Sequence, residues 1–222
     1  MRIALCGGTG DIGEGLALRW AYDTDHEVLI GSRDPEKART KAQEYETELD
    51  SRGVDRTVKG FANEMAADRA DVVVLAVPPY YVRDTVEGFA GRLDGDTVLV
   101  SPAVGMQRDD AGLHYHPPSE GSVTAVAAAA APDEVAVVGA FHNLSAGRLA
   151  NLDVELDQDT LLVGDDEDAV DIVRMLAAEI EGLRPLYAGP VANAAEIESL
   201  TPLLINLAKY NDELHDAGVQ FG

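Results

Sequence analysis

The stretch that most constrains the fold lies at the start of the chain, in residues 2–15. It begins with an apolar segment, residues 3–6, that has the character of a buried strand, and Gly8, Gly10 and Gly13 follow it. This G-x-G-x-x-G spacing is typical of a tight turn between a strand and a helix. The first glycine allows the turn, the second admits a close backbone approach, and the third lets helix and strand pack together. The sequence therefore predicts a βαβ unit at the N-terminus.

The same turn is typical of sites that bind the pyrophosphate of a dinucleotide. The first N–H groups of a helix have no intrahelical partner, so they and the positive end of the helix dipole attract an anion. A second predicted strand, residues 26–31, follows at a suitable distance. We therefore predict dinucleotide binding; the alternative is a glycine turn that serves packing alone. The residues predicted to surround the pyrophosphate are Gly8, Thr9, Gly10, Asp11, Ile12 and Gly13.

The end of the second strand indicates which dinucleotide binds. An NAD enzyme has Asp or Glu there, about 20 residues after the glycines, to accept from the ribose 2′-hydroxyl. This chain has Ser32 and Arg33 at that point, and Lys37 one helical turn later. A hydroxyl and two cations suit a 2′-phosphate, which a guanidinium can hold through two parallel bonds. We predict NADP; the alternative is a solvated Arg on a turn. Asp34 is expected to cap the helix that starts at Pro35.

The charge of the chain is strongly one-sided. Its 222 residues include 40 acidic and 17 basic side chains, and the formal net charge is −23. Only four of the basic residues are Lys, and the hydrophobic fraction is an ordinary 46%. This composition suits a folded protein that stays soluble in high salt, where repulsion between carboxylates is screened. We therefore predict a halophilic source, and the sign of the charge disfavours nucleic acid as a partner.

Cysteine content and hydropathy bear on the compartment. Cys6 is the single cysteine, so an internal disulfide is excluded, and its place in the first strand predicts a buried apolar side chain. No apolar run approaches the ~20 residues that cross a membrane. No signal-peptide pattern precedes the first strand. We expect a cytoplasmic protein without a membrane partner.

Strand and helix patterns alternate through the first two thirds of the chain. Such alternation predicts an α/β fold, a Rossmann-type doubly wound parallel sheet, in an NADP-binding domain of residues 1–149. Residues 71–77 are almost continuously apolar, as buried parallel strands are. Residues 103–121 are expected to be irregular. The predicted strands are residues 3–6, 26–31, 58–61, 71–77, 96–100 and 135–141.

The remaining residues, 150–222, predict a small C-terminal α/β lobe. A strand is expected at 161–164, a helix at 167–181 and an extended segment at 182–187. The last helix is expected to run over residues 193–217. We expect an interruption or kink at Pro202, because proline lacks the N–H that a helix interior uses.

The ends of the predicted strands define the rest of the candidate site, because ligands of open α/β sheets lie beyond the carboxyl ends of the strands. His142 follows the strand at 135–141 and is expected to hydrogen-bond the second substrate. The alternative for His142 is a side chain satisfied by local backbone. Further strand-end residues predicted to line the site are Val77, Pro78, Ser101, Ala103 and Leu144.

The candidate site contains no obvious acid for the chemistry of a ketone or imine. Lys209 is the only Lys beyond residue 59, and no Ser/His/Asp or Cys/His arrangement stands out. His114 and His116 resemble a metal pair, but no further ligand completes the spacing, so no metal is expected. A reaction that needs little acid–base help fits better. Hydride transfer between two cofactors is such a reaction, because the protein then supplies mainly orientation.

The chain resembles the archaeal F-420-dependent NADP reductases over almost its whole length. The matching stretches are GGTGDIGEGLALR near the N-terminus, GSRDPEKA after the second strand and HNLSAGRLANLD from residue 142. VGDDED, GLRPLYAGP and IESLTPLLIN continue the likeness, and generic dinucleotide folds lack these three. The resemblance implies an archaeal homodimer, and together with the acidic composition it indicates a haloarchaeal source. Such a protein would transfer hydride reversibly between reduced coenzyme F-420, a deazaflavin, and NADP+, with no residue acting as acid or base.

The resemblance also implies roles for particular residues. His142 and Leu144 would contact the deazaflavin, in a cleft that the C-terminal lobe completes. The residues that would hold the 2′-phosphate are Thr9, Ser32, Arg33 and Lys37. The chain departs from the family pattern at Asp34, where a second basic residue is common, and at Leu144, where Ile is usual. The departure at Asp34 bears on the selectivity for NADP.

Two other functions compete with this one. The first is an NADP-dependent reductase of a small imine or ketone, of which pyrroline-5-carboxylate reductase is the nearest kind. The second is a non-catalytic module that senses NADP. The absorbance of the deazaflavin after NADP+ is added to reduced F-420 distinguishes all three.

Overall fold

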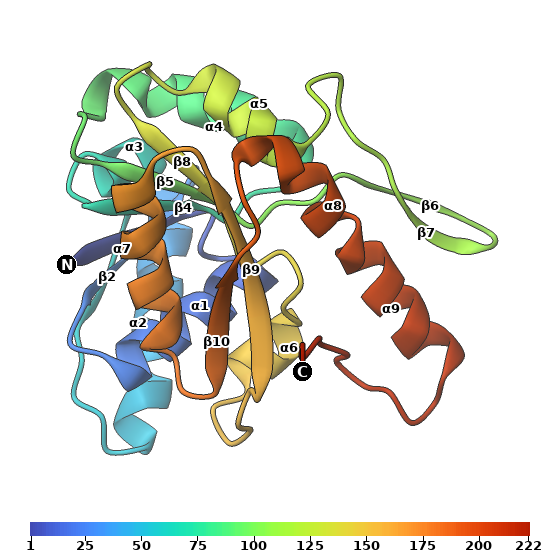
Figure 1. Cartoon of the computed structure of the whole chain (residues 1–222). Coiled ribbons are helices and arrows are strands. Elements are labelled where there is room, and N and C mark those ends of the chain that lie inside the picture. The colour runs from blue at the N-terminus through green and yellow to red at the C-terminus, as the bar shows by residue number, and fades with distance from the viewer.

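The computed structural model describes residues 1–222 and is built around one eight-stranded sheet (Figure 1). The strands lie in the order β10-β9-β8-β5-β4-β1-β2-β3. Their bounds are β1 Arg2–Cys6, β2 Glu27–Ser32, β3 Val58–Ala62, β4 Val72–Leu75, β5 Val98–Ser101, β8 Ala136–Gly139, β9 Gln158–Gly164 and β10 Leu183–Tyr187. From β3 to β8 this is the order of a dinucleotide-binding sheet, so the predicted α/β fold is confirmed.

Helices cover both faces of the sheet. Their bounds are α1 Asp11–Asp23, α2 Pro35–Ser51, α3 Asn63–Ala67, α4 Val82–Phe89, α5 Val123–Ala130, α6 Ala146–Ala150, α7 Glu167–Ala178, α8 Ala194–Glu198 and α9 Leu200–Tyr210. None of these helices combines the length and the apolar character that a membrane-spanning helix requires.

Side chains that alternate along each strand divide the core into two layers. Ile3 and Leu5 of β1 point to the face covered by α1, α2 and α7. Ala4 and Cys6 point to the opposite face, which α3, α4 and α5 cover. Since successive strand residues face opposite sides, both layers are buried, as a parallel sheet requires. Cys6 is fully buried, as predicted.

From β3 to β8, each strand runs parallel to its neighbours in the sheet. In the centre of the sheet, Leu5 pairs with Ile30 of β2 and with Val74 of β4. β9 then pairs antiparallel to β8, and β10 runs parallel to β9. The two strands of the C-terminal part therefore extend the same sheet in the reverse direction, and the carboxyl ends of β1, β2, β4, β5 and β8 share one edge.

The segment 103–121 is not irregular as predicted, because it contains a β-hairpin. Its strands are β6, Met106–Asp109, and β7, Gly112–Tyr115. The carboxylate of Asp109 accepts from the N–H groups of Ala111 and Gly112 at 2.8 and 3.2 Å, which closes the turn. In Figure 1 this hairpin extends away from the sheet beside α9.

The last helix is also shorter than predicted, and its interruption lies elsewhere. It is divided at Ser199 into α8 and α9, and it ends at Tyr210 rather than at residue 217. Pro202 lies in the first turn of α9, where its missing N–H has no intrahelical partner to lose. The proline therefore lies at the start of a helix, and residues 211–222 return along the molecule to end near α6 (Figure 1).

Candidate functional site

The glycine turn after β1 is close-packed on its protein side. Gly7 has a φ of +81°, a conformation that glycine adopts without a steric penalty. A Cβ on Gly8 would lie 2.8 Å from the carbonyl oxygen of Leu5, and one on Gly13 would lie 2.6 Å from the Cα of Gly8. Glycine is therefore required for the turn at Gly8 and for the close packing of α1 at Gly13.

Gly10 differs from these glycines, because the space beside it faces away from the protein. A Cβ there would come no closer than 3.6 Å, to the oxygen of Gly7. Gly10 precedes α1, no side chain caps the helix, and the first helical N–H bond runs from Glu14 to the oxygen of Gly10 at 2.8 Å. The N–H groups of Asp11, Ile12 and Gly13 precede that bond. This uncapped start, next to an open glycine, fits an anionic pyrophosphate.

Two side chains that sequence reasoning missed hold the turn in place. The hydroxyl of Tyr45 on α2 donates to the oxygen of Gly8 at 2.9 Å, and it is buried. The side-chain oxygen of Asn63 on α3 accepts from the N–H of Gly7 at 3.3 Å. Both residues are distant from the glycines in sequence, and only the tertiary structure brings them to the turn.

The end of β2 presents two exposed cations, as the sequence predicts. Arg33 and Lys37 are exposed, and the guanidinium carbon of Arg33 lies 4.7 Å from the ring centroid of Tyr81. Ser32 is buried, and its hydroxyl accepts from the N–H of Asp34 at 3.2 Å. The carboxylate of Asp34 accepts in turn from the N–H groups of α2, so the predicted cap is confirmed. Its charge is thereby directed at the start of α2.

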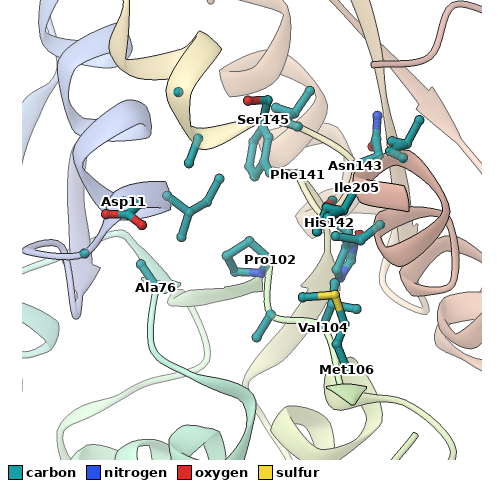
Figure 2. Close-up of a pocket in the computed structure, with 18 of the residues that line it drawn as sticks. Asp11, Ala76, Pro102, Val104, Met106, Phe141, His142, Asn143, Ser145 and Ile205 are labelled. Carbon is teal, nitrogen blue, oxygen red and sulfur yellow. Dashed lines mark hydrogen bonds between the residues drawn. The ribbon is translucent and has the colours of Figure 1, made fainter. Parts of the chain in front are cut away.

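A cleft of about 750 Å³ opens beside the glycine turn at the carboxyl edge of the sheet. In Figure 2, Asp11 lies on one side of it, His142, Met106 and Ile205 lie on the other, and Pro102 lies between. This volume is typical of a site for a small molecule. The predicted site residues that line the cleft are Gly10, Asp11, Ile12, Val77, Pro78, Ala103, His142 and Leu144.

The other predicted residues lie outside the cleft. Ser101 is fully buried at the end of β5, and its hydroxyl has no hydrogen-bond partner. Those in and behind the glycine turn are Gly8, Thr9 and Gly13, and those at the end of β2 are Ser32, Arg33 and Lys37. The structure thus separates the residues of the glycine turn and of the end of β2 from those that line the cleft.

The floor of the cleft is formed by the segment directly after β8, which contains a residue with a strained backbone. Phe141 has a φ of +66°, which is unusual for a side chain other than glycine. Its ring packs edge-on against Trp20 with centroids 5.6 Å apart, and its N–H donates to the hydroxyl of Thr160 at 3.1 Å. These contacts hold the backbone where it turns into the cleft, as is common at functional sites.

His142 follows this residue and is buried. Its Nε2 lies 3.3 Å from the hydroxyl of Thr124, whereas its Nδ1 has no partner. The hydroxyl of Thr201 donates to its carbonyl oxygen at 2.7 Å. Burial lowers the pKa of His142 to about 3, so the imidazole is neutral near pH 7. The ring is therefore an uncharged polar group in a largely apolar wall.

The C-terminal part of the chain contributes to the same wall as His142, which faces the glycine turn, and strand-end reasoning did not reach it. Leu204, Ile205 and Ala208 of α9 line the cleft, together with Thr201. Asp216 lies at the rim, where its carboxylate accepts from the hydroxyl of Ser145. The titratable side chains that line the cleft are Asp11, His142 and Asp216.

The strand order, the glycine turn and the cations at the end of β2 together define a dinucleotide-binding protein of the Rossmann type. The family model described as "NADP oxidoreductase coenzyme F420-dependent" matches residues 2–105. The F420-dependent NADP reductase of Methanothermobacter marburgensis is 39% identical over 99% of this chain and 97% of its own length. The chain therefore belongs to the F-420-dependent NADP reductases.

Solved structures agree with this fold. A protein of Arthrobacter sp. FB24, described as a candidate F420-dependent NADP-reductase, superposes with a TM-score of 0.82 at 23% identity over 100% of this chain and 99% of its own. A pyrroline-5-carboxylate reductase of Coxiella burnetii superposes with a TM-score of 0.62 at 14% identity, over 96% of this chain and 70% of its own. At these identities the likeness shows the fold alone.

Proposed function

We propose that this chain transfers a hydride reversibly between reduced coenzyme F-420 and NADP+. Family membership supports both ligands. The separation of the site supports their placement: the glycine turn and the end of β2 suit the phosphates of NADP, while the cleft beyond them suits a ring system. When bound, the two cofactors supply the chemistry, because each carries its own redox centre.

The observation that carries this proposal is that the cleft lining contains no Lys, Arg, Tyr or Cys, and that His142 is neutral. Its two carboxylates lie at the start of α1 (Asp11) and at the rim, where Asp216 accepts from the hydroxyl of Ser145. An imine or ketone reductase adds a proton as well as a hydride, and a positioned side chain commonly provides that proton. Hydride transfer between two cofactor rings needs orientation and exclusion of water instead. The apolar walls at Val104, Phe141 and Leu144 suit that role.

The test is spectroscopic. Reduced F-420 and NADP+ are mixed with the protein in molar potassium chloride, and the return of the deazaflavin absorbance is followed together with NADPH. We expect turnover that depends on both cofactors, and little with NAD in place of NADP. A protein that reduces a pyrroline carboxylate with NADPH but leaves F-420 unchanged would instead be an imine reductase. Binding of NADP without turnover of either substrate would indicate a sensing module.

Replacing His142 by alanine is expected to raise the KM for F-420 more than the KM for NADP. The ring is a polar group of the cleft wall, beyond the glycine turn. Loss of one polar contact costs about 1–2 kcal/mol, which corresponds to roughly a 5- to 30-fold change. His116→Ala is the matched control, because His116 is exposed and outside the cleft. Equal changes in the two constants would contradict the placement of F-420 beside His142.

We also propose that the lobe of residues 150–222 completes the F-420 cleft and carries a homodimer interface. α9 supports both parts of this proposal. Ala208 and Leu204 line the cleft, whereas Leu203, Leu207 and Tyr210 form an exposed stripe at a spacing of four and three residues. A row of large apolar side chains on an exposed helix commonly marks a contact between proteins.

The homodimer is tested by the mass in solution. Light scattering in molar potassium chloride is expected to give about twice the chain mass of 23.6 kDa. Leu207→Glu is expected to shift the mass to that of one chain, because a carboxylate would be buried against the partner. Met175→Glu is the matched control, since Met175 is a comparably exposed apolar side chain on α7. A dimer that survives Leu207→Glu would place the interface elsewhere.

The acidic composition supports a further proposal, that the protein works in concentrated salt. Its net charge of −23 is spread over a surface where ion pairs such as Arg2–Asp71 are largely exposed. Exposed pairs contribute little to stability, so they do not offset the repulsion among the remaining carboxylates. The cytoplasmic location stays a prediction from the sequence.

A further inference from the structure

We propose that Glu198 and Thr124 are positioning residues that hold His142 as the tautomer protonated on Nε2. The bare Nδ1 then offers a hydrogen-bond acceptor to F-420. The inference rests on the proposed function, because it takes F-420 to be the ligand of the cleft. It adds two residues to the site, neither of which lines the cleft.

The three side chains form a continuous buried chain of polar atoms. The hydroxyl of Thr124 donates to Oε1 of Glu198 at 3.1 Å and lies 3.3 Å from Nε2 of His142. Thr124 and Glu198 are both fully buried, and His142 is 3% exposed. Thr124 is the second residue of α5, Glu198 is the last residue of α8, and His142 lies just after β8. Three separate elements therefore converge on one hydroxyl group.

The direction of the hydrogen bonds determines the tautomer. A carboxylate only accepts, so the single proton of the Thr124 hydroxyl is used on Glu198. The hydroxyl oxygen then has only lone pairs to offer to His142, and Nε2 must be the protonated nitrogen. In a neutral imidazole the other nitrogen, Nδ1, is then an acceptor. This is the buried atom of His142 that has no partner within the protein.

Glu198 is held in place by more than this one bond. Its Oε2 accepts from the N–H of Val123 at 3.0 Å, and its Oε1 accepts from the N–H of Thr124 at 2.9 Å. The hydroxyl of Tyr115 on β7 lies 3.1 Å from Oε2. The pKa of Glu198 is raised, because the effect of burial exceeds the opposite effect of these donors. The two backbone N–H groups belong to the first turn of α5, where the helix dipole also favours a negative charge.

An unpartnered buried acceptor at a cleft wall suits a ligand that donates a hydrogen bond there. Leaving such an atom unsatisfied costs free energy, and a ligand donor recovers it. The 8-hydroxy-deazaflavin has donors of this kind in its ring N–H and hydroxyl groups. The tautomer also affects which ligand groups can bind, because a His142 ring protonated on Nδ1 would place its own N–H donor against the donor of the ligand.

The experiment measures the tautomer directly, in the whole protein without ligands. The protein is labelled with 15N-histidine in molar potassium chloride, and the His142 signals are assigned by their absence from His142→Asn. We expect a protonated Nε2 and a bare Nδ1. In Thr124→Val, which keeps the shape but removes the hydroxyl, we expect the signals to move towards the other tautomer. Thr124→Ser is expected to restore the wild-type pattern.

Kinetics provide the second measurement. Thr124→Val is expected to raise the KM for F-420 about 5- to 30-fold with little change in the KM for NADP, and Thr124→Ser is expected to restore it. Thr47→Val is the matched control, because the hydroxyl of Thr47 bonds only its own exposed helix. Should Thr124→Val fail to fold, Glu198→Gln tests the same step, because an amide can donate to the Thr124 hydroxyl and so release its proton to His142.

A wild-type His142 protonated on Nδ1, or a tautomer that does not respond to either substitution, would overturn the inference. An unchanged KM for F-420 in a variant with an altered tautomer would overturn the role in binding. If the tautomer behaves as expected but F-420 is never turned over, the proposed function fails while the positioning of His142 by Thr124 holds. The two failures are therefore distinguishable.

Discussion

Replacing Arg33 by alanine is expected to lower the preference for NADP over NAD by roughly 10- to 150-fold. Each hydrogen bond to a charged group contributes about 1.5–3 kcal/mol, and 1.4 kcal/mol corresponds to a factor of ten. Arg33 is exposed at the end of β2, and its guanidinium packs against Tyr81 without a carboxylate partner. It is thus free to hold a 2′-phosphate. Turnover with NAD should change little, because NAD lacks that phosphate.

The measurement is the ratio of kcat/KM for NADP to that for NAD. Arg39→Ala is the matched control, because Arg39 is a nearby exposed Arg on α2 that pairs with Glu36. Ser32→Asp should move the preference further towards NAD, since a carboxylate accepts from the ribose and repels the phosphate. A wild type that already prefers NAD, or an Arg33→Ala variant with an unchanged ratio, would disprove our interpretation of this strand end.

Dialysis to low ionic strength is expected to unfold the protein. At 1 M salt the Debye length is about 3 Å, but it is about 30 Å at 0.01 M, so carboxylates across the molecule then repel one another. The chain has 23 more acidic than basic side chains. A folded domain is stable by only about 5–15 kcal/mol, and self-repulsion of this size can exceed that margin.

Circular dichroism during dialysis from molar potassium chloride tests this expectation. Helical signal should fall as salt is removed and should return when potassium chloride is restored. Sucrose at matched viscosity is the control, because it favours compact states without screening charge. A melting temperature that is the same at low and high salt would show that the acidic surface has another purpose.

The parts of the fold that sequence reasoning predicted are those whose signal is local. The glycine turn at residues 8–13 forms because its glycines lack side chains, and their spacing in the sequence is enough to predict it. The cap at Asp34 depends on a residue and the helix directly after it. The apolar strand at 72–75 needs only its own composition to indicate burial. The carboxyl ends of such strands then predicted much of the cleft.

The parts that were missed depend on contacts between distant segments. The strand β6 has four exposed residues, so it shows no alternation of apolar and polar side chains. Thr124 and Glu198 are 74 residues apart, and nothing local marks either as a neighbour of His142. Sequence reasoning expects the break at Pro202, because proline is the stronger local signal, but the break lies at Ser199, since a proline is tolerated in the first turn of a helix. Tertiary structure decided each of these features.

The pairing of the β6–β7 hairpin with α9 constrains which segments of this chain can be exchanged with those of a relative. Asn206 exchanges two hydrogen bonds with the backbone of Leu113, at 2.9 and 2.6 Å, and Tyr210 donates to the oxygen of Ala111. A chimera that imports the last helix from a relative but keeps its own hairpin would break these bonds. The hairpin and α9, about ninety positions apart, therefore have to be exchanged together, and a change in this wall of the cleft requires matching substitutions in both segments.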